Sequence, residues 1–206
     1  MERIMKLTHR LTCYGVWFGG GLICLSAFIV GFEVLIRKVF NLSIGGADEL
    51  SGFALAIGTA WALGFALLER AHIRIDSVYM WMPLSVRAVM DLIGLVVFFI
   101  FFGFMTIRGW STFFETVALN AHSISPLGTP LVYPQFLWVV GLTFLMAVTS
   151  LLLVQVLGRL IRRDFVGIQA AVGSKTVREE LEEELIVKRK LGVSIEKNLL
   201  PPEAGR

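Results

Sequence analysis

The sequence predicts an all-α integral membrane protein with four transmembrane helices, and three observations lead to this class. Hydrophobic residues make up 56% of the 206-residue chain, and the mean hydropathy is +0.75, well above an ordinary soluble domain. The apolar residues are concentrated in four long runs that carry few charges. Lys and Arg gather at alternate ends of these runs, as expected of helices that cross a membrane in alternating directions.

The first run follows a basic head that includes Arg3 and Arg10. A cleavable signal peptide is the alternative interpretation. However, the run is longer than the apolar core of such a peptide, and no clear small-residue cleavage site closes it. We therefore predict a retained span at about 11–36. Gly15 and Gly19 have the GxxxG spacing of a helix contact face.

The second run, 50–68, contains no charge and makes a helix of about 28 Å, close to the roughly 30 Å hydrocarbon core of a bilayer. We place the second span at about 50–69. Its small residues form two stripes on nearly opposite faces, Ala54, Gly58, Ala62 and Ala66 on one and Ala56, Ala60 and Gly64 on the other. Such stripes let neighbouring backbones approach closely, so we expect a helix packed on both sides, with Gly58 and Ala60 as contact candidates.

The rest of the chain supplies two more spans and two shorter helices. Apolar runs between charged ends predict the spans, an aromatic and Met-rich segment before Pro83 predicts an interfacial helix, and a capping-box pattern predicts a tail helix. Residues 1–163 then form a membrane domain and 164–206 a cytoplasmic tail. The predicted elements are an interfacial helix at about 76–82, spans at about 88–108 and 133–160, and a tail helix at about 177–190.

The distribution of basic residues predicts the orientation. One side of the predicted membrane has Arg3, Lys6, Arg10, Arg70, Arg74, Arg87, Arg159, Arg162 and Arg163, and the other side has Arg37, Lys38 and Arg108. Cytoplasmic loops carry the excess of Lys and Arg, so we expect both termini in the cytoplasm. The pI near 9.1 then reflects topology and contact with membrane lipid, and we expect no nucleic-acid partner.

Ionisable residues cluster near the span ends. Glu33 precedes Arg37 by four residues, so the two are predicted to pair on one helical face. Asp48 and Glu49 precede the second span, where a helix start favours carboxylates. No metal-ligand cluster, nucleophile set or phosphate-binding loop is present in the sequence. We therefore expect neither enzyme activity nor a cofactor.

A homodimeric, proton-coupled small-molecule antiporter is a function of a different class that the four spans leave open. It requires a carboxylate near the bilayer midplane. Glu33 lies toward the end of the first span and within reach of Arg37, which favours a paired carboxylate over one that exchanges protons. A chain without a transport site of its own is better interpreted as a partner subunit.

The stretch from Arg37 to Asp76 carries a family resemblance. It contains Arg37-x-x-Phe40, then Asp48-Glu49-Leu50, and then Arg70-x-His72-Ile73-Arg74-Ile75-Asp76 after the second span. Over about residues 10–160 the chain resembles the small membrane subunit of tripartite ATP-independent periplasmic (TRAP) transporters, the DctQ-type family. It departs from the family at Gly46-Ala47-Asp48-Glu49, where many members have a Trp in the first position.

The resemblance implies a small permease subunit of the bacterial inner membrane, with a large permease subunit and a periplasmic solute-binding protein as partners. In that family the large subunit carries the solute, usually an organic acid, by cotransport with sodium. The small subunit is a scaffold whose outer surface helps to dock the binding protein. We expect Arg70, His72, Arg74 and Asp76 to fix the turn after the second span or to contact the large subunit. We also expect one small-residue stripe of the second span to stay free for that subunit.

Overall fold

The computed structural model describes residues 2–43, 45–70, 83–162, 167–168 and 185. These residues contain four helices that are long and apolar enough to cross a membrane, namely α1 (Glu2–Phe40), α2 (Ala47–Leu68), α4 (Leu84–Leu119) and α5 (Val132–Ile161). The predicted all-α class with four membrane helices is confirmed. The predicted interfacial helix, His72, Arg74 and Asp76 lie outside the described residues.

The chain divides into two compact units, 1–173 and 174–206. In the second unit the structure describes only Leu185, which is helical and exposed. The predicted tail helix at about 177–190 otherwise falls outside the described residues.

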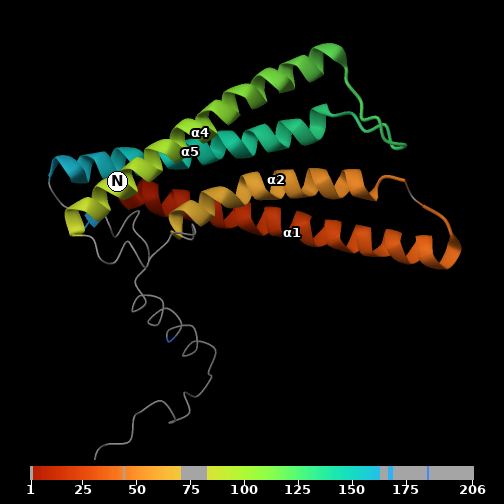
Figure 1. Ribbon diagram of the computed structural model, residues 1–206, viewed down its shortest axis with the longest axis horizontal. Coiled ribbons are helices and arrows are strands. Elements are labelled where there is room, and N and C mark those ends of the chain that lie inside the picture. The colour runs from red at the N-terminus through yellow and green to blue at the C-terminus, as the bar shows by residue number, and fades with distance from the viewer. Residues whose placement is uncertain (1, 44, 71–82, 163–166, 169–184, 186–206) are drawn as a thin grey trace, which may run out of the picture. The chain divides into compact units, whose positions relative to one another are not determined.

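The four helices of the first unit form a layer in which the packing order is α1, α2, α5, α4, and α4 crosses α5 toward the end where α4 begins (Figure 1). α1 packs against α2, α2 against α5, and α5 against α4. Consequently α2 and α5 are inner helices with neighbours on two sides. We name the end with residues 41–46 and 120–131 the turn end, and the opposite end, where α1 begins, the terminal end.

Left-handed residues stop three of the helices. Asn41, Arg70 and Asn120 have φ angles of 52°, 57° and 46° and follow α1, α2 and α4. α4 continues to Leu119, beyond the predicted span end at Arg108. The predicted span ends at the charge of Arg108, but the helical hydrogen bonds continue past it and end only at Asn120.

A cluster of buried hydrophobic residues lies near the terminal end. There the last turns of α2 and α5 meet the first turns of α4. The buried side chains of this cluster in the helices are Leu67, Ala88, Leu95, Val148, Leu152 and Val156. This cluster joins α2, α4 and α5 over the half of the layer in which α4 begins.

α1 and α2 contact one another through glycines. Gly19 faces Gly58 so closely that a Cβ on Gly19 would lie 2.6 Å from the Gly58 carbonyl oxygen. A Cβ on Gly58 would lie 2.8 Å from the Gly19 oxygen, and one on Gly15 would lie 3.0 Å from the Trp61 oxygen. Backbone atoms cannot move aside as a flexible side chain can, so this contact requires glycine.

The other flank of α2 packs against α5. A Cβ on Gly141 would lie 3.1 Å from the Ala60 Cβ and 2.8 Å from Cδ1 of Trp61. Gly64 faces Phe144 of α5, which would lie 3.7 Å from an added Cβ. α2 is therefore packed on both sides, as its two stripes predict.

Both stripes of α2 are thus used within this chain. Gly58 meets α1, Ala60 meets α5, and Gly64 lies between Thr12 of α1 and Phe144 of α5. The expectation that one stripe stays free for another subunit is wrong, because α2 is an inner helix of the layer. Gly15 and Gly19 of α1 are also taken up by α2.

Candidate functional site

Glu33 is a buried carboxylate at the turn end of α1. The Arg37 guanidinium balances its charge, and the Ser43 hydroxyl helps to orient it. Its side chain is 4% exposed, and Nη2 of Arg37 donates to Oε1 at 2.9 Å. The Ser43 hydroxyl donates to the same oxygen at 2.6 Å and accepts the Gly45 N–H at 3.2 Å. The predicted Glu33–Arg37 pair is present, and through Ser43 it also fixes the turn between α1 and α2.

A second carboxylate, Glu49, links the start of α2 to loop 120–131 at the turn end. It lies in the first turn of α2 and accepts a hydrogen bond from the Ser125 hydroxyl in loop 120–131. The loop is braced internally, since Ser123 donates its N–H to Thr129 at 2.9 Å and Gly128 donates to Ser125 at 3.0 Å.

The same loop also reaches the turn between α1 and α2. A Cβ on Gly46 would lie 2.0 Å from Leu127, and one on Gly45 would lie 3.4 Å from Pro126. Leu127 therefore occupies the space that a side chain at position 46 would need. The turn end is a joined structure built from both connecting segments.

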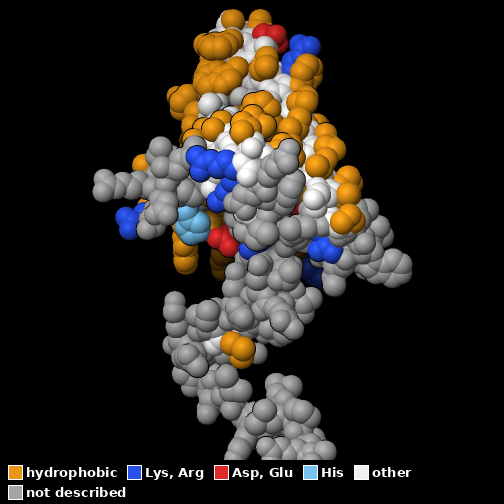
Figure 2. Space-filling view, turned by 90° about the vertical axis from the view of Figure 1, so that its left-hand side faces the viewer, with side chains coloured by type: hydrophobic (Ala, Val, Ile, Leu, Met, Phe, Trp, Pro, Cys, Tyr) orange, Lys and Arg blue, Asp and Glu red, His pale blue; other side chains and the backbone are white. Residues whose placement is uncertain are grey.

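His9 and Glu69 join α1 to α2 at the terminal end. Their Nε2 and Oε1 atoms lie 3.0 Å apart, and the His9 ring packs at a centroid distance of 6.0 Å from Phe65. Figure 2 views this end and shows Lys and Arg side chains gathered there, with a histidine and acidic side chains among them. Charged groups thus mark this end of the layer.

The remaining candidates that the structure describes, Asp48, Arg70, Gly58 and Ala60, have structural positions. Asp48 is exposed in the first turn of α2, and its carbonyl accepts the Ser51 hydroxyl at 2.8 Å. Arg70 is the left-handed residue after α2. Gly58 and Ala60 lie in the helix contacts. The structure therefore brings Glu49 to the α4–α5 loop and Glu33 to Arg37, but it does not gather the candidates into one site.

Buried hydroxyls within the membrane helices bond to their own helix. Thr106 donates to the Phe102 carbonyl at 2.7 Å, and Thr149 donates to the Leu145 carbonyl at 2.8 Å. Such back-bonded hydroxyls offer no chain of donors for a polar solute. Asp91 is the other buried carboxylate among the described residues, at 3% exposure.

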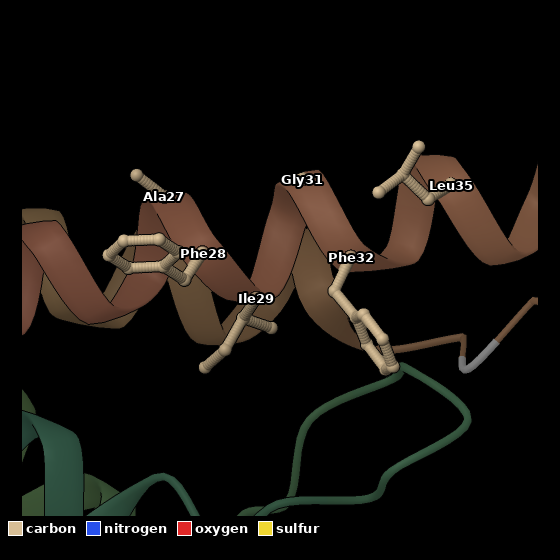
Figure 3. Close-up of a pocket in the computed structure, with 6 residues that line it drawn as sticks. All are labelled: Ala27, Phe28, Ile29, Gly31, Phe32 and Leu35. Carbon is tan, nitrogen blue, oxygen red and sulfur yellow. The ribbon is translucent and has the colours of Figure 1, made fainter.

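Two further features of the described residues show whether they could form a chemical centre. No group of three or more His, Cys, Asp or Glu side chains there is placed to hold a metal ion. A hollow on α1 is lined by apolar residues alone (Figure 3), namely Ala27, Phe28, Ile29, Gly31, Phe32 and Leu35. It has no polar side chain that would orient a hydrophilic solute.

Sequence reasoning missed four contacts that the structure supplies. Ser43 and Ser125 lie in connecting segments, where composition alone does not reveal partners. The His9–Glu69 contact has a weak signal, because both residues lie at the same end of adjacent predicted spans. Trp61 lies within an uncharged run, and its indole N–H must find an acceptor inside a membrane. The sequence does not identify that acceptor, which is the Leu137 carbonyl.

The fold defines the class of this protein as a multi-pass helical membrane protein. A family model described as "Tripartite ATP-independent periplasmic transporters, DctQ component" matches residues 26–163, and the chain belongs to this family. It is therefore a component of a transport system, the small permease subunit that the family represents. No curated protein and no solved structure gives a significant match.

Proposed function

We propose that this chain is the scaffold of a sodium-coupled transporter for an organic acid, in which the large permease subunit carries the solute. Family membership supports the assignment to a three-component transporter. The observation that carries the scaffold role is the pairing of the buried Glu33 carboxylate with Arg37 and Ser43. The Thr106 and Thr149 hydroxyls bond to their own helices, and the hollow on α1 is wholly apolar. Among the described residues of α5, Gln135 and Gln155 each keep a buried side-chain oxygen without a hydrogen-bond partner.

The antiporter alternative requires a carboxylate that gains and loses protons near the midplane. Glu33 instead pairs with Arg37 and accepts from Ser43 at the turn end of α1. This geometry supports a structural role for Glu33.

The proposed orientation has both termini in the cytoplasm of a bacterium and the turn end facing the periplasm, in the inner membrane. The excess of Arg at the terminal end supports it. An impermeant thiol reagent should label Ile124→Cys from the periplasmic side. It should label Arg162→Cys only after the membrane is opened, and the reverse pattern would reject this orientation.

In this orientation the turn end is the surface that helps to dock the solute-binding protein. The contacts of loop 120–131 with Glu49, Gly45 and Gly46 support this role, because they hold the loop in one conformation. His72, Arg74 and Asp76 remain candidates for fixing the cytoplasmic turn or contacting the large subunit. If replacing His72 and Asp76 together by Ala left complex yield and stability unchanged, neither role would hold.

Co-expression with the large permease subunit and the binding protein tests the assignment. An affinity tag on this chain should retain the large subunit in mild detergent. Sodium-driven uptake of an organic acid by the reconstituted system should need all three proteins. Full uptake by the large subunit and binding protein alone would reject the scaffold function.

A further inference from the structure

His9, Cys13 and Glu69 form a cluster of nucleophilic and ionisable side chains at the terminal end. Sγ of Cys13 lies 3.7 Å from Nδ1 of His9, and Nε2 of the same ring lies 3.0 Å from Oε1 of Glu69. His9 and Cys13 are four residues apart and share one face of α1, while Glu69 directly follows α2. Two helices therefore bring a thiol, an imidazole and a carboxylate into contact, one after another.

The two contacts of His9 determine which ring nitrogen carries the proton. An ionised carboxylate can only accept hydrogen bonds, so Nε2 carries the proton and donates to Glu69. In the neutral ring Nδ1 is then the acceptor, and it faces the Cys13 thiol. The ring also packs against Phe65, which limits its rotation. A base held by a third group beside a thiol is the arrangement that activates a cysteine as a nucleophile.

The cluster is accessible to water-soluble reagents. The side chains of His9 and Glu69 are 50% and 34% exposed, and Cys13 is half-buried. Arg10 is exposed and precedes Cys13 by three residues, so it lies on the same side of α1. A cation near a thiol favours the thiolate and attracts anionic reagents. The other free cysteine, Cys24, lies about 16 Å farther along the apolar span.

We propose that Cys13 is a site of reversible S-thiolation by a small anionic disulfide, activated by His9 and positioned by Glu69. The Cys13 thiol transfers its proton to Nδ1 of His9, and the thiolate attacks one sulfur of the disulfide. A bond forms between Sγ and that sulfur while the disulfide bond of the reagent breaks, and the departing thiolate takes the proton from His9. A free thiol reverses the step. The site does not depend on the proposed function; only the compartment of the reagent, the cytoplasm, depends on the proposed orientation.

The reaction rates of single cysteines in the purified full chain test this site. In a Cys24→Ala background, glutathione disulfide should form a mixed disulfide that mass spectrometry locates at Cys13. The control combines Cys13→Ala and Cys24→Ala with Tyr14→Cys, which moves the only thiol to the next position, 74% exposed. Cys13 should react about tenfold faster than this control although it is less exposed. Equal rates, or a faster control, would overturn the proposal.

Substitutions of the two partners separate activation from exposure. His9→Gln keeps a polar side chain without a base and should slow the reaction of Cys13 about tenfold, while thermal unfolding shows that the subunit stays folded. Glu69→Gln should slow it severalfold, and Glu69→Asp, which restores the carboxylate, should recover part of the rate. An unchanged rate in His9→Gln or in Glu69→Gln would overturn the proposal. These rates are measured without the large subunit, so failure of the proposed function would not alter them.

Discussion

The indole N–H of Trp61 on α2 donates to the main-chain oxygen of Leu137 on α5 at 3.0 Å. The same side chain lies edge-on to Phe18 of α1 and stacks on Phe144 of α5, at centroid distances of 5.7 and 6.0 Å. Trp61 therefore joins three helices. In hydrocarbon the alternative for its N–H is an unsatisfied donor, which makes this contact more than a packing detail.

Replacement of Trp61 should destabilise the isolated subunit. Trp61→Ala removes a large side chain from between α1 and α5 and should cost about 3–5 kcal/mol. Trp61→Phe keeps a ring but loses the hydrogen bond, and should cost roughly 1 kcal/mol for the bond alone. Unfolding in mixed micelles measures both. Trp17→Ala, at a position that is 82% exposed, is the matched control; equal losses at Trp17 and Trp61 would contradict the assigned role.

The glycine contact between α1 and α2 predicts a steric effect. Gly58→Leu places side-chain atoms against the Gly19 backbone and should destabilise the subunit by about 3 kcal/mol or prevent folding. Gly52→Leu, on the same helix with nothing within 4 Å of an added Cβ, should be tolerated. Folded yield and thermal unfolding of the purified subunit distinguish the two. Tolerance of leucine at position 58 would show that the helices do not approach at this point.

The pairing of Glu33 predicts a compensating double substitution. Arg37→Ala removes the positive charge beside the buried Glu33 carboxylate. It should lower the free energy of unfolding by about 1–2 kcal/mol, a value reduced by the solvent exposure of Arg37. Adding Glu33→Gln removes the charge but keeps an acceptor for Ser43, so part of the loss should be recovered. The measurement is a double-mutant cycle by chemical unfolding. Purely additive effects of the two changes would argue against the pair.

The link between Glu49 and Ser125 predicts a local change in mobility. Ser125→Ala removes the hydroxyl that donates a hydrogen bond to Glu49. The backbone amide hydrogens of loop 120–131 should then exchange with solvent deuterium about tenfold faster. Ser111→Ala is the control, because the Ser111 hydroxyl donates to the Ile107 carbonyl of its own helix. Unchanged exchange in the loop would show that Glu49 does not hold it.

Several features were predictable because they follow from local sequence. The four membrane helices follow from long uncharged runs, and the Glu33–Arg37 pair follows from a spacing of four residues. The two-sided packing of α2 follows from its paired stripes. In each case the controlling interaction lies within one helix or is imposed by the bilayer.

Other features depend on partners that the sequence does not identify. Trp61 and Leu137 are separated by 76 positions, and His9 and Glu69 by 60. Which neighbour fills each stripe of α2 depends on the order of helices in the layer. The predicted span ends at the charge of Arg108, whereas α4 continues to Leu119, because a helix ends only where its hydrogen bonding ends.

We propose that this chain supports transport without carrying the solute. Uptake into reconstituted proteoliposomes tests this proposal. Sodium-driven uptake of an organic acid should be measured in proteoliposomes with the large subunit and binding protein, with or without this chain. Uptake should depend on this chain and should persist with its Glu33→Gln variant, because Glu33 has a structural role. Proton-coupled transport by this chain alone, abolished by Glu33→Gln, would contradict the account.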